Sequence, residues 1–141
     1  MTSVRRDARR DGFTLIELLI VTVILGVLAS IAVPKIGHVR ERGYFASIQQ
    51  DFRRLGQNQE MYHVLNNGYG DSVVDLEFST SPGVMITMVE ATLTGWSAVG
   101  THSSLDDDRG CAIYLGDAEP PALPDGTPHT GATGQVQCTG S

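Results

Sequence analysis

The feature that most constrains this chain is a long apolar run close to its N-terminus. Residues 13–33 contain a single charged side chain, that of Glu17. Because an α-helix rises 1.5 Å per residue, this run would reach roughly 30 Å, the thickness of a bilayer's hydrocarbon core. A carboxylate costs roughly 2.5–3.5 kcal/mol at the centre of such a helix and less near its end. The run therefore predicts a membrane-spanning helix whose one acid, Glu17, needs a partner.

The residues before the run predict its orientation. Residues 1–12 hold four arginines and two aspartates. Because basic residues favour the cytoplasmic side, we expect a cytoplasmic N-terminus and an exported remainder. A cleaved secretory signal is the alternative, with Ser30-Ile31-Ala32 as its cleavage site. The apolar region of such a signal is usually about 7–15 residues, so the longer run and Glu17 argue against it.

Two residues are expected to weaken this helix. Gly26 costs about 1 kcal/mol relative to alanine in a helix interior. Pro34 removes a helical hydrogen bond and clashes with the carbonyl of Ser30, at a cost of about 3 kcal/mol. The stretch between Gly26 and Pro34 is therefore predicted to be the weakest part of the helix. A simple kink where the membrane span meets water is the alternative.

Beyond Pro34 the sequence predicts an amphipathic helix over residues 34–64. Apolar side chains recur there at helical spacing, with Gln59 interrupting them: Phe45, Ile48, Phe52, Leu55 and Tyr62. One apolar stripe of this kind is typical of a helix packed on one face, here expected to lie beneath a sheet. Asn66-Asn67-Gly68 supplies turn and C-cap chemistry at its end. We expect one helix from about Phe13 to Val64.

Residues 65–141 are predicted to form a small β-sheet head. Short strands are expected at residues 84–89, 95–99 and 111–115, joined by short connections as an antiparallel meander. Residues 119–134 are rich in Pro, Gly and Thr and are expected to form a loop. A head of about 80 residues has a small hydrophobic core and usually needs further stabilisation, such as a disulfide. Cys111 and Cys138 in an exported domain predict a disulfide that closes the C-terminal loop. The long helix and the sheet together predict an α+β fold.

The head is strongly acidic and carries no recognisable catalytic pattern. From residue 65 onward there are ten acids and one base, Arg109. Such a surface repels nucleic acid, so we expect no direct nucleic-acid binding. Asp106-Asp107-Asp108 could contribute to a calcium site, but a solvated turn is the favoured interpretation. The histidines have no metal-ligand spacing. We therefore expect neither an enzyme, a cofactor nor a metal.

Taken together, these residues resemble the type IV pilin and pseudopilin family. The match consists of a basic leader ending in Gly12, the sequence Phe13-Thr14-Leu15-Ile16-Glu17, the apolar run and the long helix that follows. The resemblance implies four segments: a leader at 1–12 that is removed, a membrane and assembly half of the helix at 13–33, an amphipathic half at 34–64, and a head at 65–141 with a C-terminal disulfide-bounded loop.

The resemblance also implies processing and partners. A prepilin peptidase would cut between Gly12 and Phe13 and N-methylate Phe13, whose amine would pair with Glu17 of a neighbouring subunit or of its own chain. The helix would loosen between Gly26 and Pro34 in the filament. The subunit would reside in the inner membrane with its N-terminus cytoplasmic, and then join a helical homopolymer on a pilus or secretion assembly platform.

Three functions follow from these observations. The first is a structural subunit of a cell-surface type IV pilus. The second is a pseudopilin of a type II secretion system, located in a periplasmic pseudopilus. Cys111 and Cys138 favour the pilus, because major pseudopilins usually carry a calcium loop with Pro and Trp instead of a disulfide. The third is a bitopic, membrane-anchored binding or enzymatic domain whose stem only resembles a pilin.

Overall fold

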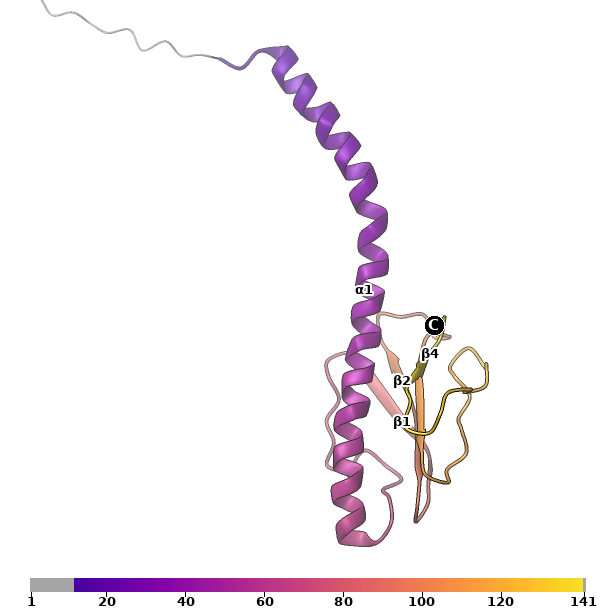
Figure 1. Cartoon of the computed structure of the whole chain (residues 1–141). Coiled ribbons are helices and arrows are strands. Elements are labelled where there is room, and N and C mark those ends of the chain that lie inside the picture. Colours follow the sequence, from indigo (N-terminus) through magenta and orange to yellow (C-terminus); the bar gives the residue numbers. More distant parts are fainter. Residues whose placement is uncertain (1–11, 141) are drawn as a thin grey trace, which may run out of the picture. The chain divides into compact units, whose positions relative to one another are not determined.

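The computed structural model describes residues 12–140, which divide into two compact units (Figure 1). The first unit ends at His38 and the second, the head unit, begins at Val39. Helix α1 (Leu15–Asn66) contributes to both. The leader predicted at residues 1–12 lies outside the described residues except for Gly12.

The first unit contains the apolar part of α1. The side chains of residues 15–32 are exposed within the chain, and the window of highest hydropathy has none of its residues buried. Among the described residues, α1 is the one helix long and apolar enough to cross a membrane by length and composition. The helical assignment continues across Gly26 and Pro34. The weakening expected between these two residues stays a prediction.

In the head unit, α1 buries the predicted apolar stripe. Ile48, Phe52 and Leu55 are fully buried. Gln59, which interrupts the stripe, is also buried. Its side-chain amide pairs with both backbone groups of Gly70: Nε2 donates to the Gly70 carbonyl at 2.8 Å, and Oε1 accepts from the Gly70 amide at 2.9 Å. A polar residue on the core face is tolerated when it is bonded in this way.

The C-terminus of α1 confirms the predicted cap. Asn67 has a positive φ of 54°. Its amide donates to the carbonyl of His63 at 2.8 Å, which is the geometry of a left-handed C-cap. Asparagine is one of the few non-glycine residues that adopts this conformation readily.

The sheet confirms the predicted antiparallel meander. Its strands are β1 (Val84–Ala91), β2 (Trp96–His102), β3 (Gly110–Leu115) and β4 (Gln137–Cys138), in the order β1-β2-β3-β4. Strand β1 is longer than expected because the pairing with β2 shifts between Met88 and Glu90 and then resumes. Strand β4 pairs with β3 at only two positions, and the sequence does not predict this two-residue strand.

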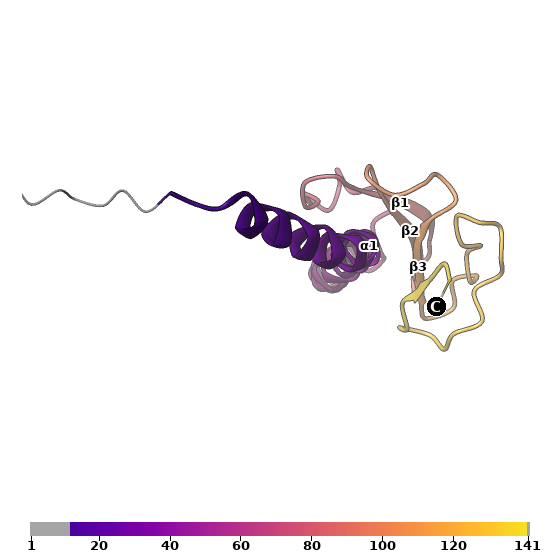
Figure 2. The ribbon, with the colours of Figure 1, turned by 90° about the horizontal axis from the view of Figure 1, so that it is seen from above.

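The core lies between α1 and the sheet. Trp96, Ala98 and Ile113 pack there against the helical stripe. The C-terminal loop lies on the side of the sheet away from the head part of α1 (Figure 2). Among the described residues of this loop, the one β-type pairing is the isolated bridge between Ala122 and Pro128. The loop prediction for residues 119–134 is therefore confirmed.

The predicted disulfide is present. Cys111 of β3 and Cys138 of β4 are directly opposite in the ladder and bonded to each other. Both are buried at the edge of the core. The bond ties the end of the C-terminal loop to the sheet, and the α+β fold class is confirmed with it.

Candidate assembly site

The candidate site is the start of α1, where three of the predicted site residues lie close together in sequence. Gly12 and Phe13 precede the helix and are exposed, Phe13 by 81%. Among the described residues other than its neighbours, no atom lies within 4 Å of the position that a Cβ would take at Gly12. The segment formed by Gly12 and Phe13 is thus exposed and precedes the first helical residue.

Glu17 closes a capping box with Thr14. The Glu17 Oε2 atom accepts from the Thr14 amide at 2.8 Å and from the Thr14 hydroxyl at 2.7 Å. In return, the Glu17 amide donates to Thr14 Oγ1 at 3.3 Å. Thr14 is the N-cap residue and Glu17 occupies the third helical position, so two otherwise unpaired backbone amides are satisfied.

This arrangement gives Glu17 a partner that sequence reasoning missed. The spacing Thr14-x-x-Glu17 is itself the signal of a capping box, whereas the cost of a charge in a membrane does not indicate this contact. The carboxylate lies at the positive end of the helix dipole, which favours its charge. Its second oxygen, Oε1, accepts no hydrogen bond from the residues that the structure describes, so it is available to a cation.

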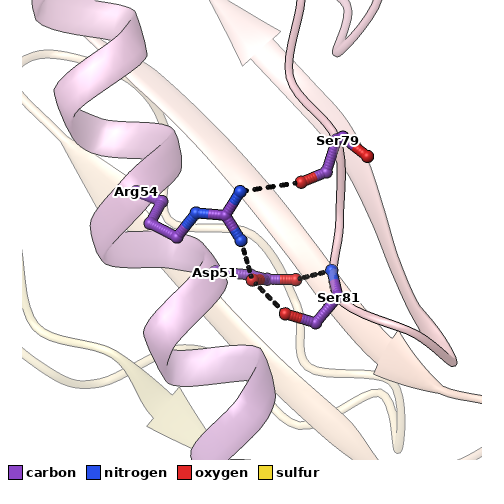
Figure 3. Close-up of polar contacts among 4 residues, drawn as sticks. All are labelled: Asp51, Arg54, Ser79 and Ser81. Atoms are coloured by element: carbon purple, nitrogen blue, oxygen red, sulfur yellow. Dashed lines mark hydrogen bonds and ion pairs between the residues drawn. The ribbon is translucent and has the colours of Figure 1, made fainter.

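A buried carboxylate in the head unit was also missed. Asp51 is 0% exposed and accepts from both the amide and the hydroxyl of Ser81, at 2.6 and 2.8 Å (Figure 3). Arg54 donates to Asp51 Oδ1 at 3.1 Å and to the carbonyl of Ser79 at 3.2 Å. Asp51 follows Ile48 by three residues, which places it on the buried face. This network fixes the segment before β1 to the helix.

A second set of contacts joins the same helix to the loop between β2 and β3. Arg109 forms an ion pair with Glu41 and lies 5.5 Å from the ring centroid of Phe45. Tyr44 stacks on His102 at a centroid distance of 4.3 Å. These contacts hold both ends of the loop against α1, at His102 and at Arg109.

The other residues considered for chemistry remain apart. Within residues 12–140, no group of three or more His, Cys, Asp or Glu side chains could hold a metal ion. Asp106, Asp107 and Asp108 are exposed, and the Asp106 carbonyl accepts from the Arg109 amide at 2.8 Å. This geometry is that of a turn.

Comparisons with known proteins include a family match over the same part of the chain. The prokaryotic N-terminal methylation motif matches residues 7–33. The chain is 31% identical over 96 residues to the type IV wide pilus major component PilA4 of Thermus thermophilus, an alignment that covers 65% of this chain and 73% of that protein.

Two further relatives match over shorter alignments. The type II secretion system core protein G of Aeromonas hydrophila is 39% identical over 61 residues, 43% of each chain. The type IV major pilin protein PilA of Myxococcus xanthus is 32% identical over 79 residues, which cover 56% of this chain and 36% of that protein. The chain therefore spans less than half of either of these two relatives. With the methylation motif and the PilA4 match, it belongs to the type IV pilin and pseudopilin family.

Proposed function

We propose that this chain is a structural subunit of a type IV pilus and has no enzymatic activity. The observation that supports this most directly is the order of features at the start of α1. An open Gly12-Phe13 segment precedes a capped helix, and Glu17 lies in the first turn of that helix. The apolar remainder of the stem is exposed within the chain and would be covered first by lipid and then by other stems.

Cleavage between Gly12 and Phe13 by a prepilin peptidase would create a new amine at Phe13, directly before Thr14. N-methylation would leave that amine positively charged. The free Oε1 of Glu17 would then accept the amine of a neighbouring subunit, while Oε2 keeps the cap. A buried charge is tolerated when an opposite charge meets it, and such a pair also specifies the register between subunits.

We assign a separate role to each segment of the chain. Residues 1–12 form the removed leader, 13–33 the membrane and assembly segment, 34–64 the amphipathic helix, and 65–141 the head. Before assembly the subunit would be held in the inner membrane with its N-terminus cytoplasmic. It would then join the filament on a pilus assembly platform, with the helix loosening between Gly26 and Pro34.

A pseudopilin of a type II secretion system is the second candidate. The relatives named core protein G support it, because they match this chain at 32–41% identity. The disulfide between Cys111 and Cys138 supports the pilus instead, because major pseudopilins usually carry a calcium loop with Pro and Trp in its place. Sheared surface filaments made mainly of this chain would favour the pilus, and short periplasmic fibres would favour the pseudopilus.

Two substitutions at Glu17 test the assembly role. Glutamine can still cap at the third helical position, whereas alanine cannot. We expect both Glu17→Ala and Glu17→Gln to be processed and inserted, but to yield few filaments by shearing and immunoblot, because both lack the charge. Normal filaments from Glu17→Gln would show that capping alone is needed, and normal filaments from Glu17→Ala would refute any assembly role for this residue.

A further inference from the structure

A cleft of about 380 Å³ lies in the head unit beside one flank of α1. It is called the basic cleft here, and its apolar lining comes from the helix, two strands and the C-terminal segment: Phe52, Trp96, Ile113, Leu115 and Val136. Of the residues that line it, Arg53 alone carries a charge. Arg53 is exposed, and the described residues offer it no ion-pair partner. The cleft thus offers apolar surface beside an unpaired cation.

The helix extends this positive surface beyond the cleft. Arg42, Ala46, Gln49, Arg53 and Gly56 follow one another at spacings of three and four residues, so they share one face of α1. Arg42 is exposed, as Arg53 is, and lies outside every ion pair found among the described residues. Small residues at positions 46 and 56 let another chain approach this face closely.

The complementary surface is the turn at residues 71–77, called the acidic turn here. Asp71, Asp75 and Glu77 are exposed and no base lies among them. Val74 is 79% exposed between them. No ion pair to these acids is found in residues 12–140. The acidic turn therefore presents an exposed apolar residue with acids on both sides, and its charge is opposite to that of the basic cleft.

The acidic turn is held in a defined conformation. Leu76 is buried, and its carbonyl accepts from Asn58 Nδ2 at 3.3 Å. The Phe78 amide donates to the Val73 carbonyl at 2.9 Å, and the Ser72 hydroxyl donates to Asp75 Oδ2 at 2.7 Å. A turn that is already ordered loses little entropy when it docks, so it is suited to a specific contact.

The two surfaces lie on opposite flanks of the same helix. Gln49, Arg53 and Gly56 line the basic cleft, whereas Asn58, Tyr62 and Leu65 line a second hollow together with Asp75 and Glu77. At 100° per residue, these two sets of helical positions point in roughly opposite directions. One copy therefore cannot bring its own turn to its own cleft. A contact between copies would be head-to-tail and could repeat along a filament.

We propose that the acidic turn of one copy docks in the basic cleft of a second copy. Val74 would contact the apolar lining, and Asp75 and Glu77 would face Arg53 and Arg42. This proposal rests on the proposed function, because it describes a head contact within the same polymer. It adds a charge-specific register between heads to the contact between stems.

Cysteine cross-linking tests this contact in filaments of the full chain. Gly56→Cys with Val74→Cys places one thiol in the cleft and one on the turn. Cys111 and Cys138 are bonded to each other, so the engineered thiols are the only free ones. The new Cβ at position 56 would lie 3.8 Å from Trp96, an ordinary contact. A helix about 10 Å wide separates the two sites within one chain, too far for a disulfide.

We expect oxidation of these filaments to give a ladder of dimers, trimers and longer species on a non-reducing gel. The matched control is Gly56→Cys with Leu93→Cys, which keeps the cleft thiol but moves the other to an exposed residue outside the turn. It should give no ladder. In separate strains, Arg53→Glu should reduce filament yield at least about tenfold, and adding Glu77→Arg should restore it.

The outcomes separate this proposal from the one on which it rests. Wild-type filaments with no ladder from the Gly56 and Val74 pair, together with a normal yield from Arg53→Glu, would overturn the docking contact alone. Absence of filaments from the wild-type chain would overturn the proposed function and the docking contact with it.

Discussion

At the scale of single residues, Asp117 shows how hydroxyl groups position an exposed acid. Hydrogen bonds from Thr94 at 2.6 Å and from Thr92 at 2.7 Å hold the pKa of the Asp117 carboxyl below its ordinary value. They link the turn between β1 and β2 to the residues after β3. Backbones are close there: a Cβ at Gly116 would lie 1.9 Å from the Thr94 carbonyl oxygen, and Gly116 has a positive φ of 68°. Only glycine fits that position.

This contact predicts a defined pH dependence. Because the folded-state pKa is lowered, the contact stabilises the fold fully above about pH 4, the ordinary aspartate value, and this contribution is lost as the pH falls through the lower folded value. Thr94→Val should move the Asp117 carboxyl midpoint upward in an NMR titration of the full chain in micelles. Thr127→Val is the control: it removes the hydroxyl that donates to Asp125 and should leave the Asp117 midpoint unchanged. An unchanged Asp117 midpoint in Thr94→Val would contradict the assignment.

At the scale of secondary-structure elements, the Asp51 network explains how the segment before β1 is fixed to α1. The carboxylate is buried and uses both oxygens, and the Arg54 guanidinium also lies 5.3 Å from the ring centroid of Phe78. The pair with Arg54 is half exposed on the arginine side, so most of the stabilisation comes from the hydrogen bonds to Ser81.

Removing the Asp51 carboxylate should therefore loosen this connection. Asp51→Ala leaves the Ser81 amide and hydroxyl without their acceptor, and we expect a loss of about 3 kcal/mol in unfolding free energy. For a head of this size that corresponds to a fall in Tm of more than about 10 °C, measurable by circular dichroism in detergent. Asp107→Ala, at an exposed acid, should change Tm little. Equal effects from both variants would show that the network contributes nothing.

The elements differ in how far the sequence could predict them. The helical stripe of Ile48, Phe52 and Leu55 is a local pattern, so it predicted the buried face of α1 directly. Gln59 could be read only as an interruption, because its partner is the backbone of Gly70, brought close by the fold. Strand β4 has two residues and depends on its pairing with β3, so no local pattern could indicate it.

The site shows the same contrast. The Thr14 and Glu17 cap was available from spacing alone and was missed, because Glu17 was considered only as a charge in a membrane. The basic cleft could not be predicted, since Arg53, Trp96 and Val136 are far apart in sequence and meet only in the folded head. The disulfide was predictable because the chain holds only two cysteines.

At the scale of the whole molecule, the proposed function combines two kinds of surface. The stem is apolar and exposed, which suits lipid before assembly and other stems afterwards. The head carries ten acids and one base from residue 65 onward, while the helix before it carries unpaired arginines. The proposed contact between heads depends on exposed charges and should weaken as salt screens them, whereas contacts between apolar stems, with their charge pair buried, should weaken much less.

The most direct test of the proposed function is the intact mass of the chain purified from filaments and, separately, from membranes. We expect the filament subunit to begin at Phe13, with one methyl group on that residue and one disulfide, because in the proposed function the new amine pairs with Glu17. Gly12→Arg, which alters the cleavage site, should leave the full precursor in the membrane and give no filaments. A filament subunit that keeps residues 1–12, or one that begins at Val33, would contradict the proposed function.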